Sequence, residues 1–392
     1  MGGGSTVTIA QRMFEGMNSF ALLAIPLYTF AGFTMSKGGI SKRLMDFCYS
    51  IVGHIYGGLA HVNVLSSMIF AGISGSAVAD TAGVSGMFMP EMVRKGYSKN
   101  FTVAVTAISS TIGIIIPPSI PMVVIAGICG ISTGKLFLGG IIPGVLCGLA
   151  QMIVSYFMAK KEGVPKEPGH FTIGPVLHGL WESWPALLMP IIIVGTITMG
   201  IVSPTEAGVI AVVYGLFAGG IIYRELKWED IKFAFAETVR TSGRIFIVIG
   251  AAKLYTVMLT TAGFDKWVAK TMLGFSTNPT VILIVILLIF FIVTMFMESI
   301  ATLTLFMPIL YPIALGVGIN PIVLSVLITV VIGVGLVTPP VGMCIYVACD
   351  LMDVTVGEVF PTLVPFIAAT FVCIALMVAF PQLILLPTYL MA

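Results

Sequence analysis

The chain has 392 residues, of which 58% are hydrophobic and only 9% are charged, and its formal net charge is +2. A soluble domain has about 25% charged residues, so this composition excludes a soluble globular protein and indicates a polytopic helical protein embedded in a lipid bilayer. The nearly balanced charge gives no reason to expect a nucleic-acid partner. The six cysteines are scattered through apolar segments and are predicted to be packing residues.

The elements follow from the apolar runs, because a membrane span needs roughly 20 apolar residues. Residues 1–8, which begin MGGGS, are interpreted as an added tail rather than a signal peptide. Segments long enough to span are predicted at 18–36, 100–130, 136–158, 182–202, 207–222, 243–262, 320–350 and 362–388. A polar stretch at 159–180 divides the chain.

Two further apolar regions, 57–95 and 279–316, are interrupted in the middle by small and polar residues. Non-helical backbone at membrane depth is tolerated only where protein or water satisfies its amides. We therefore predict that each region is a re-entrant helical hairpin whose tip lines a cavity. Amphipathic segments at 41–52 and 263–274 precede the hairpins and are predicted to lie at the membrane interface, and 228–244 is predicted to be another amphipathic surface helix.

An internal repeat relates the two halves of the chain. At a shift of 222 positions the aligned pairs are Pro117-Pro118 with Pro339-Pro340, Gly113 with Gly335, Pro143 with Pro365, Pro90 with Pro312, and Asp80 with Thr302. Paired interrupted segments in corresponding halves are typical of secondary transporters. The predicted domains are a first repeat (9–158, with broken helix 100–130), a connecting loop and linking span (159–206), and a second repeat (207–392, with broken helix 320–350).

The two repeats are predicted to be inverted. If each hairpin returns to the side from which it entered, five crossings separate the hairpins, and an odd number makes them open to opposite faces. In this arrangement fourteen Lys and Arg side chains gather on one face and four on the other, with Lys253 inside a span. The positive-inside rule makes the basic face cytoplasmic. If the first arm of each hairpin crossed fully, the split would be twelve against six.

The first hairpin tip and the first broken helix are rich in oxygen atoms. Ser74, Ser76 and Asp80 lie together at the tip, and an ionisable residue at membrane depth indicates a functional site. The prolines at 117–118 remove backbone donors and are predicted to leave the carbonyls from Gly113 to Ile116 without intrahelical partners. Hydroxyl, carbonyl and carboxylate oxygens are hard ligands, so we predict a Na⁺ site here.

The second half repeats this design. Glu298 and Thr302 lie at the second tip, and Gly335, Thr338 and Pro339 lie at the second break, which predicts another Na⁺ site. The helix N-termini that follow the two Pro-Pro pairs direct positive dipole ends into the same region, which favours an anionic substrate group. The residues predicted to bind the substrate are Ser76, Ser119, Lys253, Glu298, Thr302 and Pro339.

Each of these side chains also has a structural interpretation. An isolated Ser or Thr in a span more often packs helices together, whereas burying an unneeded carboxylate costs at least roughly 2.5–3.5 kcal/mol, so function is favoured for Asp80 and Glu298. Lys253 either contacts the substrate or pairs within the scaffold. Glu206 lies at a predicted turn, where a capping role is as well supported as a functional one.

Four motifs resemble a known family. They are GGLAHVNVLSSMIFAGISGSAVADTAG (57–83), IIIPPSIPMVV (114–124), SPTEAG (203–208) and TPPVG (338–342). They are similar to the large membrane subunit, the M or DctM-type permease, of tripartite ATP-independent periplasmic (TRAP) transporters, and the similarity runs over essentially the whole chain. Family members usually begin with one more transmembrane helix ahead of IAQRMFEGMNSF (9–20), where MGGGS stands here.

The resemblance implies a multi-pass protein of the bacterial inner membrane that imports an organic acid anion, such as sialic acid, a C4-dicarboxylate or a 2-oxo acid, with two or more Na⁺ ions and no organic cofactor. It also implies an elevator-type movement, a small four-helix membrane subunit (Q) and a periplasmic substrate-binding protein (P). The positions that match family motifs are Ser74, Ser76 and Asp80 for the first hairpin, Glu298 and Thr302 for the second, and Gly335, Thr338 and Pro339 for the second ion-site loop.

An ion exchanger or channel without an organic substrate is the alternative function. A channel predicts a continuous polar stripe along several helices, whereas polarity here gathers at two midplane points. An enzyme predicts a nucleophile–base pair or a metal set, and the sequence places no His or Lys near either hairpin tip. We therefore predict a transporter rather than an enzyme.

Overall fold

The computed structural model describes residues 6–164 and 172–391, so residues 1–5 of the predicted tail and Lys166 of the basic face lie outside the described residues. Over the described ranges the structure is helical and has no strands. The elements of the first half are α1 (Thr6–Met17), η1 (Phe20–Leu23), α2 (Ala24–Lys37), α3 (Ile40–Val52), α4 (Gly58–Ser74), α5 (Ala77–Arg94), α6 (Lys99–Ser110), η2 (Thr111–Ile114), α7 (Ile120–Cys129) and α8 (Thr133–Glu162).

Two linking helices and a second set follow. The elements are α9 (Ile173–Thr198), α10 (Pro204–Phe217), η3 (Ala218–Ile222), α11 (Trp228–Thr261), α12 (Phe264–Phe275), α13 (Pro279–Thr294), α14 (Ser299–Gly316), α15 (Pro321–Gly335), α16 (Met343–Met352), α17 (Val356–Ala379), α18 (Gln382–Leu385) and η4 (Leu386–Met391). Helices α5 and α14 begin and end 222 residues apart (299 − 77 and 316 − 94), and α1 and α11 begin 222 apart (228 − 6). The repeat therefore extends through the helices, while the domain limits at 158 and 207 stay a prediction.

The predicted hairpins are present. Helix α4 ends at Ser74, where Gly75 takes a left-handed conformation (φ 64°) that a residue without a Cβ adopts readily. Ser76 then caps α5 by accepting a hydrogen bond from the backbone N–H of Ala79. In the second hairpin Glu298 caps α14 in the same way. A cap two residues after the preceding helix explains why the first tip is so short.

Both Pro-Pro pairs break a helix, as predicted. Helix α6 gives way to the 3-10 turn η2 and then to Pro117-Pro118, and α7 starts only at Ile120. Helix α15 ends at Gly335, and α16 starts at Met343 after Pro339-Pro340. Both Pro-Pro peptide bonds are cis.

Seven of the described helices are long and apolar enough to cross a membrane by length and composition: Phe20–Lys37, Thr133–Glu162, Ile173–Thr198, Pro204–Ile222, Trp228–Thr261, Ser299–Gly316 and Val356–Ala379. This confirms the polytopic all-α fold. One expectation was wrong, because the surface helix 228–244 and the span 243–262 form the single helix α11. Without a proline in this stretch, Ser242 and Gly243 alone do not end the helix.

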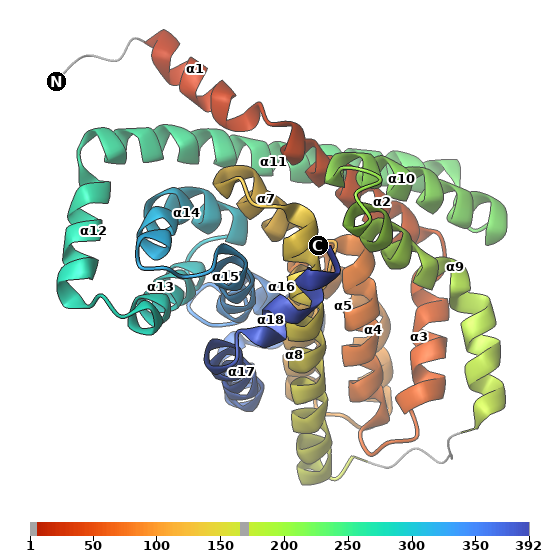
Figure 1. Cartoon of the computed structure of the whole chain (residues 1–392). Helices are drawn as coiled ribbons and strands as arrows, with labels where there is room; N and C mark the ends of the chain where they lie inside the picture. The colour runs from red at the N-terminus through yellow and green to blue at the C-terminus, as the bar shows by residue number, and fades with distance from the viewer. Residues whose placement is uncertain (1–5, 165–171, 392) are drawn as a thin grey trace.

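The helices pack in two groups. Helix α2 packs on α10 and α11, α1 packs on α11, and α3 and α9 extend this group. The hairpins, the broken helices, α8 and α17 form the other group, and α3–α4 and α11–α14 contacts join the two. Figure 1 shows α11 running along the edge of the molecule beside α1.

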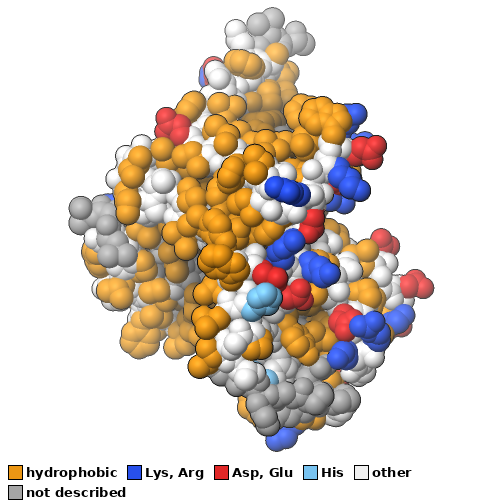
Figure 2. Space-filling view, turned by 90° about the vertical axis from the view of Figure 1, so that its right-hand side faces the viewer, with side chains coloured by type: hydrophobic (Ala, Val, Ile, Leu, Met, Phe, Trp, Pro, Cys, Tyr) orange, Lys and Arg blue, Asp and Glu red, His pale blue; other side chains and the backbone are white. Residues whose placement is uncertain are grey.

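The outer surface is apolar. Large exposed hydrophobic side chains include Phe157 on α8, Ile191 on α9 and Val213 on α10. Figure 2 shows hydrophobic side chains over most of one face, with Lys, Arg, Asp and Glu gathered toward one side. Such a surface suits lipid or other apolar membrane helices rather than water.

Candidate functional site

Asp80 is the most deeply buried carboxylate at the two hairpin tips, with an exposed fraction of 0%. The hydroxyl of Ser74 donates to its Oδ1 atom. Its Oδ2 atom accepts no hydrogen bond from any described residue. A Cβ added at Gly113 would lie 2.0 Å from Oδ2, so this oxygen lies directly against the backbone of the first break. A buried carboxylate oxygen without a donor among the described residues is available to a cation, a proton or a water molecule.

The first tip is joined to the first break through the backbone. The N–H of Ile120 donates to the carbonyl of Gly75 over 3.2 Å. A Cβ at Gly75 would lie 2.5 Å from the carbonyl oxygen of Pro118, so only glycine allows this approach. The hairpin tip, Asp80 and the Pro-Pro turn therefore form one site.

The predicted carbonyl ligands of this site are only partly free. The carbonyl of Ile114 accepts the Ser119 hydroxyl over 2.5 Å. The N–H of Ile116 donates to Ile112 (3.0 Å), and no described donor outside a helix is assigned to the Gly113 or Ile116 carbonyl. Ser119 itself is fully buried and also accepts from the N–H of Met122 (3.3 Å), so its hydroxyl is engaged in capping α7.

The second tip is built differently. The carboxylate of half-buried Glu298 accepts backbone N–H groups of Ile300 (2.8 Å) and Ala301 (3.3 Å), and the Ser299 hydroxyl also donates to it. Thr302 is fully buried, and its hydroxyl donates to the Glu298 carbonyl over 3.0 Å. Glu298 is thus supplied with donors by its own helix end, whereas Asp80 has an oxygen without one.

The second break lies against the second tip in the same way as the first. The N–H of Val341 donates to the carbonyl of Met295 over 3.0 Å. A Cβ at Gly335 would lie 2.7 Å from the Thr294 Cβ atom, which packs α15 closely on α13. The Thr338 hydroxyl donates to its own helix at Val334 (2.7 Å), and Pro339 is half-buried beside it.

The two sites face each other because the repeats exchange partners. The half-helix α7, after the first break, packs on α14 of the second hairpin, and α16, after the second break, packs on α5 of the first hairpin. The Cys344 thiol on α16 lies within hydrogen-bonding reach of Thr81 on α5 and Ser110 on α6, so a helix of the second repeat contacts the first site. A Cβ at Gly333 would lie 3.2 Å from the Cβ of Thr111, its counterpart at the shift of 222, which places the repeat axis here.

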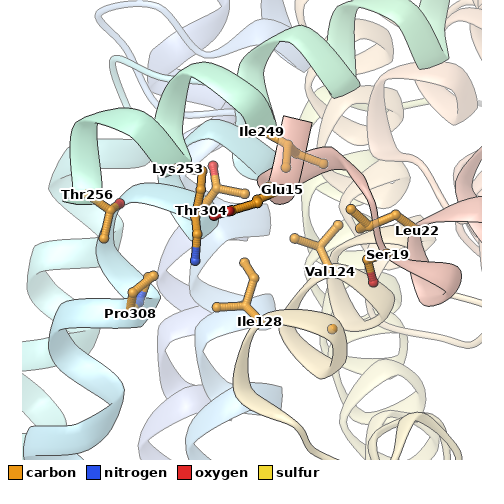
Figure 3. Close-up of a pocket in the computed structure, with 12 residues that line it drawn as sticks. Glu15, Ser19, Leu22, Val124, Ile128, Ile249, Lys253, Thr256, Thr304 and Pro308 are labelled. Carbon is orange, nitrogen blue, oxygen red and sulfur yellow. The ribbon is translucent and has the colours of Figure 1, made fainter. Parts of the chain in front are cut away.

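A pocket of about 230 Å³ lies between the two helix groups. Helices α1 and α11 form one wall, with Glu15, Lys253 and Thr256, and helices α7 and α14 form the other, with Thr304 and Pro308 among its residues. Figure 3 shows the Lys253 side chain extending from α11 into the pocket, toward Ile128 and Pro308.

Lys253 is the basic residue that lines the pocket. Its ammonium group has no ion-pair partner among the described residues, because Glu15 pairs with Arg12 instead (2.9 Å). A Cβ at Gly16 would lie 2.6 Å from the Lys253 Cβ, so the α1–α11 crossing fixes the base of this side chain. Because this ammonium group has no ion-pair partner among the described residues, it is available to an anionic group of a ligand in the pocket, which Glu15, Thr256 and Thr304 also line.

The predicted substrate residues therefore separate in space. Lys253 lines the pocket, whereas Ser76, Ser119, Glu298, Thr302 and Pro339 do not. The sequence pattern places Thr304 at the second hairpin tip but does not indicate a pocket that Thr304 shares with Glu15, Ser19 and Thr256, since only the packing of α1, α7, α11 and α14 brings these residues together. Glu206 completes a capping box with Ser203 at the start of α10, which accounts for its position at the turn.

Two hairpins docked on two broken helices, in an inverted all-helical membrane chain, define the class of secondary transporters. Residues 1–383 match the family model described as the DctM component of the tripartite ATP-independent periplasmic transporter. The chain therefore belongs to this family and is a transport permease subunit rather than an enzyme.

Named relatives support this family assignment. The sialic acid TRAP transporter large permease protein SiaM of Vibrio cholerae is 36% identical over 377 residues, 96% of this chain and 88% of that protein. The C4-dicarboxylate TRAP transporter large permease protein DctM of Pseudomonas aeruginosa is 34% identical over 387 residues, 98% of this chain and 90% of that protein. The isethionate TRAP transporter permease protein DctMQ of Oleidesulfovibrio alaskensis is 36% identical over 360 residues, but this chain spans only 57% of its length.

The fold itself is shared more widely. The YdaH transporter of Alcanivorax borkumensis, described as having an unusual topology, superimposes with a TM-score of 0.62 over 97% of this chain and 90% of that one. Its sequence identity of 12% makes this a likeness of fold alone.

Proposed function

We propose that this chain is the membrane permease of a Na⁺-coupled importer of an organic acid anion. The observation that carries the proposal is the Oδ2 atom of Asp80, which is buried without a donor against the backbone at Gly113. An isolated carboxylate in a low-dielectric interior is costly unless a cation compensates it. Oxygen ligands from a carboxylate and freed carbonyls suit a hard monovalent cation.

The anion is proposed to bind beside Lys253, in the pocket between the two helix groups. The pocket volume of about 230 Å³ is smaller than the roughly 300–1,000 Å³ of pockets for drug-sized ligands, which suits a small organic acid. The named relatives carry sialic acid, C4-dicarboxylate and isethionate, all of which are organic anions.

Coupling follows if cation binding at the second tip moves α14, the helix that begins at that tip and lines the anion pocket farther along. Thr304 and Pro308 belong to α14, the second arm of the second hairpin, so a change at that tip reaches the pocket directly. Each ligand then increases the affinity for the other by the same factor. In this proposal the hairpin group moves against α1, α2, α10 and α11 as an elevator, in a bacterial inner membrane.

The family also implies partners. We propose a small membrane subunit of the Q type and a periplasmic protein of the P type that delivers the anion, and the fused name DctMQ of one relative supports the first of these. The test is uptake of a radiolabelled organic acid into proteoliposomes containing all three components. We expect uptake under an inward Na⁺ gradient and none under an equal K⁺ gradient. Na⁺ flux without anion uptake for any acid that the binding protein holds would instead favour an ion exchanger or channel.

Replacing Lys253 by alanine should weaken the apparent affinity for the anion about tenfold or more, because a hydrogen bond to a charged group contributes about 1.5–3 kcal/mol. The measurement is the anion concentration at half-maximal uptake. The control is Lys270→Ala on α12, which removes an exposed ammonium group outside the pocket. An unchanged half-maximal concentration in Lys253→Ala would show that Lys253 does not bind the anion and has only a structural role.

A further inference from the structure

A continuous line of buried polar side chains runs between α4 and α6, away from the Asp80 site. We call it the α4–α6 seam, and it consists of Asn63, Ser67, Thr102, Thr106 and Ser109, each with an exposed fraction of 0%. Neither ion nor anion binding, as described above, uses these residues.

Hydrogen bonds connect most of the seam. The side-chain amide of Asn63 donates to Thr106 (2.7 Å) and accepts from Ser109 (3.0 Å), and Ser67 donates to Ser109 (3.1 Å). Successive members on α6 are three or four residues apart, so they share one helix face.

The seam runs along α6 from the Asp80 site to Lys99, which belongs to the face of the molecule predicted to be basic. We call that side of the molecule the basic end. At the end of the seam nearer Asp80, the hydroxyl of Ser110, the residue after Ser109, lies 2.6 Å from the hydroxyl of Thr81, the residue after Asp80. At its other end Thr102 lies within one turn of Lys99, where α6 begins. The seam thus spans almost the whole of α6.

Some polar atoms in the seam and beside it have no hydrogen-bond partner among the described residues. Among the described residues, Thr102 Oγ1 has no hydrogen-bond partner, and neither do Gln151 Oε1 and Ser155 Oγ on the adjacent helix α8. The amide nitrogen of Gln151 donates to the Ile108 carbonyl (3.3 Å), which holds this side chain against α6. A buried polar atom without a hydrogen-bond partner lowers the stability of the fold by about 1–3 kcal/mol. An ordered water molecule usually supplies the missing hydrogen bond.

The second repeat shows that the fold does not need this polarity. At the shift of 222, the counterparts of the five seam residues are Val285, Ile289, Leu324, Ile328 and Val331. On α13 every residue from Ile282 to Val293 is apolar, so a slightly different alignment gives the same result for that helix. Helix α15 has buried Ser325 and Thr329 beside the aligned positions, but their hydroxyls donate to carbonyls of their own helix, at Pro321 (2.7 Å) and Ser325 (2.9 Å). Among the described residues, side-chain hydrogen bonds therefore join α4 to α6 in the first repeat, whereas none joins α13 to α15 in the second, which points to a role beyond packing.

We propose that the α4–α6 seam is a hydrated path through which the cation bound at Asp80 leaves toward the basic end of the chain. This inference rests on the proposed Na⁺ coupling. The path is one-sided, because in the described part of the second repeat no side-chain hydrogen bonds join α13 to α15, and the hydroxyls of Ser325 and Thr329 bond within their own helix. By the positive-inside rule the basic end is cytoplasmic, so the seam leads in the direction of uptake.

The first test asks whether the seam holds water. In the purified full chain, Thr102→Cys should react with the small cationic reagent 2-aminoethyl methanethiosulfonate at least about ten times faster than Thr329→Cys, after the rate of the unaltered chain is subtracted. Thr329 is a matched control, since it is equally buried on α15 and its hydroxyl bonds to its own helix at Ser325 (2.9 Å). Equal, slow rates for both variants, with full labelling after unfolding, would overturn the hydrated path whether or not uptake depends on Na⁺.

The second test asks whether the cation uses the path. Thr102→Val removes a hydroxyl that has no protein partner, so the unfolding temperature should stay the same or rise. Turnover of Na⁺-driven uptake should nevertheless fall at least about fivefold, while Thr329→Val keeps the turnover of the unaltered chain. Unchanged turnover in Thr102→Val would overturn the exit role, and uptake without any Na⁺ dependence in the unaltered chain would overturn the proposed function and the exit role together.

Discussion

Replacing Asp80 by asparagine should lower Na⁺-driven uptake at least about a hundredfold while leaving the chain folded. The asparagine has the same shape and retains an oxygen for the Ser74 hydroxyl, but it removes the negative charge from the buried position beside Gly113. A hundredfold loss corresponds to about 2.8 kcal/mol of binding, at about 1.4 kcal/mol for each factor of ten. This is slightly less than the roughly 3–5 kcal/mol that removing one partner of a buried ion pair costs.

Two measurements separate this effect from misfolding. Saturating Na⁺ should raise the unfolding temperature of the unaltered chain, since a ligand at 100 times its Kd stabilises the folded state by about 2.7 kcal/mol. Asp80→Asn should lose most of this shift while unfolding no earlier than the unaltered chain in K⁺. Asp350→Asn is the control, because Asp350 is an exposed carboxylate at the end of α16. An undiminished Na⁺ shift in Asp80→Asn would remove Asp80 from the ion site.

The sequence predicts those features of the Asp80 site that depend only on residues close together in the chain. Consecutive prolines break α6 and α15 whatever surrounds them, because their missing N–H groups cannot continue the helix. Gly75 and Ser76 specify a helix end followed by a helix start, and that is where the first hairpin turns. The repeat then predicts a second copy, and the structure contains it.

Features that depend on packing between distant segments were not predictable in this way. The path of the chain around the first break was also not predictable, and it brings the Ser119 hydroxyl back to the carbonyl of Ile114, five residues earlier. The pocket around Lys253 exists because α7 and α14 cross from the opposite group to face α1 and α11. The polarity of α6 was visible in the sequence, but only the contacts with Asn63 and Ser67 on α4 make it a connected seam.

The repeat also suggested two equivalent ion sites, and the structure gives them different chemistry. Asp80 lies within the first turn of α5, so one oxygen is directed at the break rather than at the helix end. Glu298 lies at the cap position of α14 and receives N–H groups from its own helix. A carboxylate whose lone pairs are already used by N–H donors has fewer left for a cation, so we expect the Asp80 site to bind the cation more tightly.

Gly113→Ala is the second variant for which we expect a large effect, because it changes the Asp80 site without changing its charge. The added Cβ would lie 2.0 Å from Asp80 Oδ2, far below a van der Waals contact. The carboxylate cannot easily retreat, since Ser74 holds its other oxygen and the N–H of Ile120 holds the tip at Gly75. Overpacking of this kind costs about 1–3 kcal/mol, and it fills the space beside Oδ2 where a cation would be held.

We therefore expect Gly113→Ala to raise the Na⁺ concentration at half-maximal uptake at least about tenfold, with a lower unfolding temperature. Gly86→Ala on α5 is the matched control, because nothing lies within 4 Å of the added Cβ. In a helix interior this change should be neutral or stabilising by up to about 1 kcal/mol, with uptake retained. A Gly113→Ala chain that folds and keeps the Na⁺ dependence of the unaltered protein would show that the cation does not bind between Asp80 and the first break, since no cation could share that space with a methyl group.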